Sequence, residues 1–148
     1  DMIDKCRSGF SAEIAHTVAP RARAAIERHR QKGDHVVLLT TSTPYVAGLF
    51  AQALTMPVIC SELEVKGGVF TGRIVEPLCF GRGKLTRAER WARAHDVDLG
   101  RCAFYTDSYS DLPMLDRVGV PVAINPDPRL LRTARRRGWP VEKWNREA

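Results

Sequence analysis

Short apolar runs alternate with helix-like segments along most of this chain, and this alternation restricts its fold more than any other feature. Four runs have the composition of buried strands, namely His35–Thr40, Pro57–Cys60, Ala103–Thr106 and Val120–Ile124. Short apolar runs bounded by turn residues are typical of parallel strands that are covered on both faces. Strands that alternate with helices predict an α/β fold with a doubly wound, mostly parallel, Rossmann-like sheet.

The segments between these runs carry recognisable helix and turn signals. Proline at a first helical position and glycine after a last one predict helices over 20–32, 44–54, 81–95 and 128–138. Asp127 directly precedes the last helix and is a good N-cap. Glycines at 67 and 68 separate two further apolar runs, which predicts a β-hairpin over 62–75. The segment 139–141 predicts a final edge strand.

Length and composition describe one domain. The 148 residues are enough for a hydrophobic core, and 44% of them are hydrophobic. No apolar run approaches the roughly 20 residues that span a bilayer, so we expect no membrane span. The four cysteines, Cys6, Cys60, Cys79 and Cys102, lack C-x-x-C spacing, which argues against a zinc site and a disulfide framework. We therefore expect a cytoplasmic protein.

The net charge of +6 owes much to arginines near the end of the chain. They are Arg129, Arg132, Arg135, Arg136 and Arg137. Such a cluster can contact nucleic acid or an anionic surface. It is more often the solvated face of a helix, and no aromatic residue interleaves with it. We therefore do not expect nucleic-acid binding.

Two carboxylates, Asp107 and Asp111, follow the predicted strand at 103–106, and Leu112 then begins a helix-like stretch. Ligands of open α/β sheets bind beyond the carboxyl ends of the strands. Two acids four residues apart at such a place can hold a hard cation such as Mg²⁺ through oxygen ligands. The plainer alternative is a loop of solvated acids, one of which caps the helix.

Two other polar features lead to the same predicted edge of the sheet. Hydroxyl side chains fill positions 40–43, and Lys84 stands where a glycine-bearing loop becomes a helix. A helix N-terminus and an ammonium group attract phosphate, and carboxylates can hold the Mg²⁺ that neutralises it. Together these are parts of a phosphoryl-transfer site. Taken singly, the hydroxyls are ordinary helix caps and Lys84 is an ordinary surface lysine.

The order of these features resembles the haloacid dehalogenase-like hydrolases, in particular the branch that contains phosphoserine phosphatase. The matching stretches are HVVLLTTSTP at 35–44, GRGK at 81–84 and YTDSYSDLPML at 105–115. FTGRI at 70–74, AINPDP at 123–128 and GWP at 138–140 also look like that branch. The resemblance covers about residues 20–144 and implies the Rossmann-like core of that family.

The resemblance also implies a role for each candidate residue. Thr40 matches the hydroxyl that binds the transferring phosphoryl group, and Lys84 matches the lysine that steadies the nucleophile and the phosphate charge. Asp107 matches the carboxylate that ligates Mg²⁺, and Asp111 supports the metal site directly, or through Lys84 or water. Neighbouring hydroxyls are implied as supporting groups, toward the substrate at Thr41 and Ser42 and within the metal loop at Ser108 and Ser110.

One part of the family pattern has no match near the start of this sequence. The family's first motif is an Asp-x-Asp pair on the central strand, whose first aspartate is the nucleophile and forms an aspartyl-phosphate. Its second aspartate is the general acid and base. The pair Asp1 and Asp4 has the wrong spacing, and residues 1–19 look like the tail of the family's helical cap. We therefore expect a hydrolase core over 20–148 that lacks the central first strand and most of the cap.

A missing central strand has a physical cost, because unpaired backbone groups on both of its neighbours are expensive to bury. We expect the 148 residues alone to be poorly stable, or to pair with an N-terminal segment or another chain that completes the sheet. A cooperative, high-temperature melt of the isolated monomer would count against this expectation.

The leading functional hypothesis is a Mg²⁺-dependent phosphatase of a small phosphorylated metabolite, such as phosphoserine or histidinol phosphate. Its nucleophile lies outside this sequence, so we expect these residues alone to be inactive. The alternative is a non-catalytic remnant that binds phosphate, a metal or a partner. An encoded protein without any Asp-x-Asp strand would favour that alternative.

Overall fold

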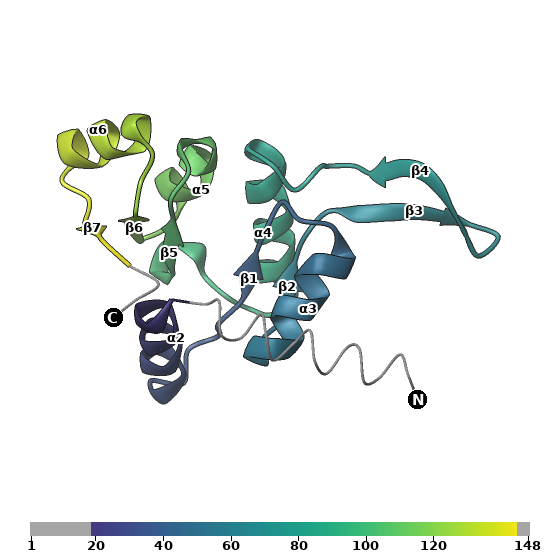
Figure 1. Ribbon diagram of the computed structural model, residues 1–148, viewed down its shortest axis with the longest axis horizontal. Coiled ribbons are helices and arrows are strands. Elements are labelled where there is room, and N and C mark those ends of the chain that lie inside the picture. Colours follow the sequence, from purple (N-terminus) through teal and green to yellow (C-terminus); the bar gives the residue numbers. More distant parts are fainter. Residues whose placement is uncertain (1–18, 145–148) are drawn as a thin grey trace.

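The structure is a computed structural model in which residues 19–144 are described. The predicted cap tail therefore lies, apart from Ala19, outside the described residues. Parallel strands with helices on both sides form the core, which confirms the predicted α/β class. Strand β1 (Leu38–Leu39) pairs with β2 (Val58–Ile59), and β5 (Ala103–Thr106), β6 (Val120–Ile124) and β7 (Val141–Glu142) form a second parallel sheet (Figure 1).

The helices confirm the predictions from proline and glycine signals. Within the described residues they are α2 (Pro20–Gln31), α3 (Pro44–Leu54), α4 (Arg82–Ala94), α5 (Leu112–Arg117) and α6 (Pro128–Arg137). Asp127 caps α6 as predicted, because its carboxylate accepts the N–H of Leu130 at 2.8 Å. Short 3-10 turns cover Leu99–Arg101 and Tyr109–Asp111. None of the helices over 19–144 is long and apolar enough to cross a bilayer.

The predicted hairpin is present as β3 (Glu62–Lys66) and β4 (Val69–Val75), which pair in antiparallel fashion. Its turn contains Gly67 in the left-handed region, at φ 59°. Figure 1 shows the hairpin projecting away from the two parallel sheets. Its base is fixed by Arg87 of α4, which is buried and donates to the Glu62 carboxylate at 2.8 Å and to carbonyls at and just beyond the end of β4.

Three predicted strands are shorter or shifted in the structure. The run 35–40 forms a strand only at Leu38–Leu39, and the run 57–60 only at Val58–Ile59. The final edge strand is Val141–Glu142 and not 139–141. Apolar composition identifies a segment that can be buried, whereas the length of a strand depends on its ladder partners. β1 pairs along one edge only within the described residues, so its ladder stays short.

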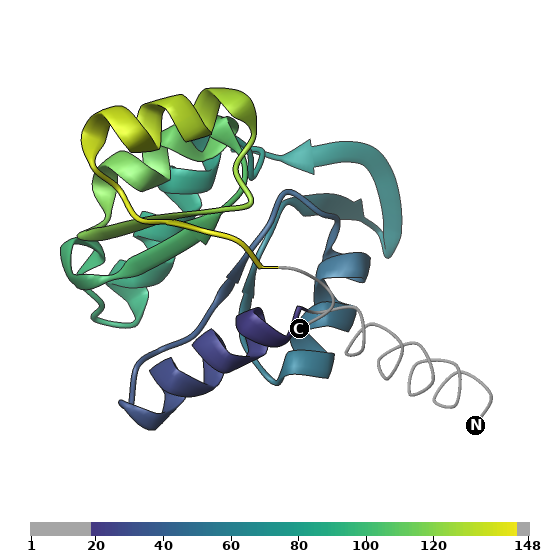
Figure 2. The ribbon, with the colours of Figure 1, turned by 60° about the vertical axis from the view of Figure 1, so that its left-hand side comes forward.

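The core lies between the sheets and helices α4, α5 and α6. One cluster joins Leu115, Ala123, Leu130 and Ala134, and another joins α4 and α5. Phe104 of β5 packs against both clusters. Residues alternate between the faces of a strand, so Tyr105 points to the opposite face, where its hydroxyl contacts α2. Figure 2 shows α2 separated from the α5 and α6 layer by the strands.

The parallel strands do not form one continuous ladder. β1 pairs only with β2 and β5 only with β6 within residues 19–144. All four residues of β5 are half-buried, whereas the last three residues of β6, which has partners on both edges, are buried. The facing edges of β1 and β5 border the same pocket.

Candidate functional site

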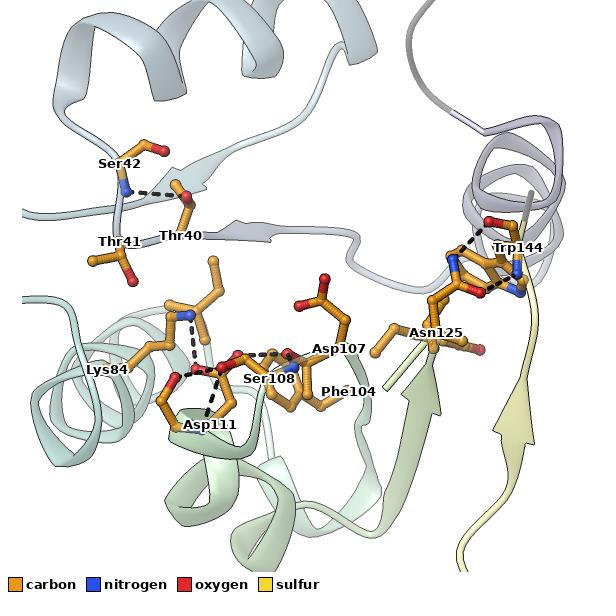
Figure 3. Close-up of a pocket in the computed structure, with 15 residues that line it drawn as sticks. Thr40, Thr41, Ser42, Lys84, Phe104, Asp107, Ser108, Asp111, Asn125 and Trp144 are labelled. Atoms are coloured by element: carbon orange, nitrogen blue, oxygen red, sulfur yellow. Dashed lines mark hydrogen bonds and ion pairs between the residues drawn. The ribbon is translucent and has the colours of Figure 1, made fainter. Parts of the chain in front are cut away.

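A pocket of about 480 Å³ lies where β1 and β5 end. All the predicted site residues line it: Thr40, Thr41, Ser42, Lys84, Ser108, Ser110, Asp107 and Asp111. They come from three separate segments, namely the loop after β1, the start of α4 and the loop after β5, and Figure 3 shows all of them except Ser110 with labels. These residues therefore lie around one pocket, although β1 and β5 belong to separate sheets over residues 19–144. Their chemical roles stay predictions.

Lys84 and Asp111 form a buried ion pair at the base of the pocket. The Lys84 Nζ lies 2.8 Å from Oδ1 of Asp111, and the two residues are 7% and 4% exposed. The other oxygen of Asp111 accepts the hydroxyl of Thr106 at 2.5 Å. The plainer interpretations are therefore wrong for both, because Lys84 is not a surface lysine and Asp111 is neither solvated nor a side-chain cap of α5.

The loop before α4 determines where Lys84 stands. At Gly83, a Cβ atom would lie 1.9 Å from the carbonyl oxygen of Leu78, so a side chain there would collide with the main chain. Gly81, at φ 55°, makes the left-handed turn that starts the helix. These two glycines let the chain turn tightly, and the first turn of α4 then directs Lys84 toward Asp111.

Asp107 contrasts with Asp111. Its side chain is exposed, and it makes no hydrogen bond or ion pair with any residue of the described range. Figure 3 shows its carboxylate directed into the pocket. Its backbone carbonyl is held by the N–H of Asp127 at 2.9 Å, which fixes the end of β5 to the start of α6. Asp107 is thus a positioned carboxylate with free oxygens.

The residues that line this pocket offer one unpaired carboxylate, that of Asp107, to a Mg²⁺ ion. No cluster of three or more His, Cys, Asp or Glu residues occurs within the described range. Mg²⁺ is often held by one or two carboxylates together with substrate phosphate and water. Asp107 supplies one such carboxylate. Both oxygens of Asp111 already have partners, which favours the indirect role for Asp111, through Lys84, over direct ligation.

The hydroxyl loop at 40–43 leads into α3. Thr43 is the N-cap residue of α3, yet its side chain makes no capping bond. The Oγ1 of Thr40 accepts the N–H of Ser42 at 3.1 Å, which shapes the loop. The interpretation of these hydroxyls as simple helix caps is therefore not supported. Thr40, Thr41 and Ser42 face the same pocket as Lys84 (Figure 3).

Two site residues were missed in the sequence. Thr106 bridges the loop, because its Oγ1 donates to Asp111 and accepts the N–H of Ser108 at 3.2 Å. A hydroxyl at the last position of a strand was the available signal. Asp127 was predicted only as a cap, but its carboxylate also accepts the N–H of Tyr109 at 2.7 Å. The backbone N–H groups of Leu130 and Tyr109 lower the pKa of Asp127.

Asn125 and Trp144 border the side of the pocket opposite Lys84 (Figure 3). The Asn125 amide donates to the carbonyl of Trp144 at 2.7 Å and accepts its N–H at 2.9 Å. This reciprocal pair ties the loop after β6 to the segment after β7. It closes the pocket on that side with a fixed wall.

The chain is similar in sequence to known proteins. The sequence profile of the haloacid dehalogenase-like hydrolases matches residues 2–116. A phosphoserine phosphatase of Mycobacterium tuberculosis is 39% identical over 130 residues, which cover 86% of this chain and 42% of that protein. A histidinol-phosphatase of Neisseria meningitidis is 31% identical over 138 residues, covering 89% and 62%.

Solved structures agree with the fold. A Bordetella pertussis protein of unknown function superposes with a TM-score of 0.84 at 30% identity, covering 95% of this chain and 66% of that one. A substrate-bound phosphoserine phosphatase superposes with a TM-score of 0.64 at 18% identity, covering 84% and 58%. The chain spans 42% to 62% of the length of the two curated relatives above.

Proposed function

This chain belongs to the haloacid dehalogenase-like hydrolase family, and from that membership we propose that the complete protein is a Mg²⁺-dependent phosphatase of small phosphomonoesters. The observation that carries the proposal is that a buried lysine and an exposed carboxylate line one pocket. Lys84 is buried and oriented by Asp111, and the oxygens of Asp107 bond no other residue over 19–144. A cation and a cation-binding carboxylate at one opening suit a phosphate dianion.

The residues divide the work as follows. The Lys84 ammonium donates a hydrogen bond to a phosphate oxygen, and its ion pair with Asp111 holds the ammonium in position. The Thr40 hydroxyl and the loop to Ser42 donate hydrogen bonds to other phosphate oxygens. Asp107 is the described residue that would hold Mg²⁺. When bound, this ion neutralises phosphate charge and so favours attack by a nucleophile.

The nucleophile belongs, in this proposal, to a segment outside the 148 residues, and it reacts through an aspartyl-phosphate that water then hydrolyses. The facing edges of β1 and β5 support a missing strand. Leu38 donates its N–H to the carbonyl of Pro57 just before β2, and Thr40 donates to that of Ile59 in β2. Val120 donates to the carbonyl of Cys102 before β5. Successive residues of a parallel strand direct these groups to opposite edges, so Leu39 and Tyr105 direct theirs to the open sides.

We infer that an extended segment, from the same protein or another chain, pairs in this place and brings an acid to the pocket. Without such a segment, the backbone groups of Leu39 and Tyr105 on the open edges would stay half-buried and unpaired. The test compares thermal melts of residues 1–148 and of the complete protein. We expect a broad or low-temperature transition for the former. A sharp, equally high transition of monomeric 1–148 would contradict the missing strand.

An assay of phosphate release tests the function itself. The complete protein should release phosphate from phosphoserine or histidinol phosphate, substrates suggested by the names of two relatives. The release should require Mg²⁺ and stop with EDTA. Phosphate binding without turnover on a broad panel of phosphomonoesters would favour the alternative of a non-catalytic binding module. The cytoplasmic location stays a prediction.

A further inference from the structure

Three polar side chains connect the end of α2 to the wall of the pocket. The Nδ1 of His29 lies 2.8 Å from Oδ2 of Asp34, and its Nε2 lies 2.9 Å from the hydroxyl of Tyr105. Tyr105 lines the pocket and stands two residues before Asp107. The proposed phosphoryl chemistry uses none of these three groups, yet both ring nitrogens of His29 are engaged.

The donors and acceptors in this chain of bonds have a definite direction. A carboxylate only accepts hydrogen bonds, so the Nδ1 of His29 carries the proton that Asp34 accepts. In the neutral imidazole, Nε2 is then the acceptor. In this neutral form the hydroxyl of Tyr105 donates to His29, and Asp34 sets the tautomer that makes this possible.

The Tyr105 ring is held on two sides. The His29 ring meets it edge-on, with 5.8 Å between centroids and 76° between planes. The Trp144 ring lies 5.5 Å away at a tilt of 33°. Within residues 19–144, β5 has a ladder partner on one edge only, and these side-chain contacts add to that ladder in holding this part of the strand.

The end of β5 thus has two anchors. On one side the N–H of Asp127 holds the carbonyl of Asp107. On the other side the His29 ring bonds the hydroxyl of Tyr105, which stands two residues before Asp107. Movement of either anchor would turn the last strand residues, and with them the direction in which the Asp107 carboxylate enters the pocket.

We propose that Asp34 and His29 are positioning residues, which act through the Tyr105 hydroxyl to hold Asp107 in place for its cation. This inference rests on the proposed function. Partners one layer beyond a metal ligand commonly change metal affinity or activity by about tenfold to a hundredfold. The competing explanation is a local contact that only ends α2, because Asp34 lies five residues after His29 and its N–H also bonds the His29 carbonyl.

Matched variants of the complete protein separate the two explanations. Tyr105→Phe removes only the hydroxyl. His29→Leu removes the bonds of both ring nitrogens, to Asp34 and to Tyr105, and His29→Gln keeps an amide donor and acceptor. His95→Gln is the control, because His95 also ends a helix but bonds its own helix, at the carbonyl of Trp91, and does not line the pocket. Calorimetry of Mg²⁺ binding is the first readout, and the Mg²⁺ concentration for half-maximal phosphate release is the second.

Tyr105→Phe and His29→Leu should each weaken Mg²⁺ binding by about tenfold. Their double variant should be no weaker than either, since both remove the same link. His29→Gln should recover part of the loss, and the control should match the wild type. Mg²⁺ binding within about twofold of the wild type in Tyr105→Phe, or losses that multiply in the double variant, would overturn the proposal.

A nitrogen NMR spectrum of the imidazoles gives an independent readout. At a pH where His29 is neutral, it should show the proton on Nδ1, and Tyr105→Phe should shift its Nε2 signal but not that of His95. The opposite tautomer would overturn the proposal. If the protein binds Mg²⁺ but hydrolyses no phosphomonoester, the proposed function fails while calorimetry still decides this inference.

Discussion

Asp107 and Asp111 lie on one short loop, yet the structure prepares them for different tasks. Asp111 is 4% exposed, and its two oxygens are held by Lys84 and Thr106. Asp107 is exposed, and its carboxylate, which bonds no other residue in the described part of the chain, is directed into the pocket (Figure 3). A buried, paired carboxylate is a fixed part of the framework, whereas a free one is available to a ligand. The D-x-x-x-D spacing alone does not distinguish these two states.

The largest expected effect comes from removing the free acid. Asp107→Ala should reduce Mg²⁺-dependent turnover of the complete protein by on the order of a thousandfold. Its free energy of unfolding should change by only about 0.5 kcal/mol, because the side chain has no described partner. Steady-state kinetics and urea unfolding measure the two quantities. Retained turnover would refute the assignment of Asp107.

Removing the partner of the buried Asp111 should instead change the free energy of unfolding strongly. Lys84→Met leaves the Asp111 carboxylate buried without a cation, which should lower the free energy of unfolding by about 3–5 kcal/mol. Urea unfolding measures the loss. Adding Asp111→Asn to this variant should restore part of it, because the unpaired charge is gone. A loss as small as that of an exposed ion pair, below about 1 kcal/mol, would show that the pair is not a buried unit.

The second partner of Asp111 offers a finer test. Thr106→Val keeps the shape of the side chain but removes the hydroxyl that donates at 2.5 Å. Loss of a hydrogen bond to a charged group should cost about 2 kcal/mol of stability. Thermal unfolding measures the effect, and Thr71→Val is a control, because Thr71 donates to Glu64 on the exposed hairpin. Equal, small losses in both variants would mean that Asp111 does not depend on Thr106.

The smallest effect concerns the cap that holds the loop to α6. Asp127→Ala should cost about 1 kcal/mol at neutral pH. The N–H groups of Leu130 and Tyr109 lower the pKa of Asp127, so its stabilisation is present above the ordinary aspartate pKa of about 3.9 and is lost as the pH falls through the lowered folded value. The stability difference between wild type and variant should therefore shrink in acid. A difference that grows below pH of about 4 would contradict this sign.

The sequence supported the helices and the site better than the strands. Pro20, Pro44 and Pro128 start helices through a local restriction of φ, so their signals survive folding. The hairpin turn is equally local. The ends of β1 and β7 depend on ladder partners that are distant in sequence, and the apolar pattern overestimated the length of β1 and placed β7 one or two residues early.

The site residues converged because ligands of α/β folds bind beyond the carboxyl ends of the strands, a rule that needs no coordinates. Their environments did not follow from spacing. The burial of Lys84 depends on α4 packing against α5, and the partner of Asp111 at Thr106 depends on the turn at Tyr109–Asp111. The contact of His29 with Tyr105 joins residues 76 positions apart, and no local pattern predicts it.

Calorimetric titration of Mg²⁺ into the complete protein, beside its Asp107→Asn and Asp111→Asn variants, tests the division between the two acids most directly. Both changes keep the size of the side chain and remove one charge. The account predicts that Asp107→Asn loses measurable Mg²⁺ binding, whereas Asp111→Asn stays within about tenfold of the wild type. Strong binding by Asp107→Asn, together with its loss in Asp111→Asn, would show that the buried acid is the metal ligand and would contradict the account.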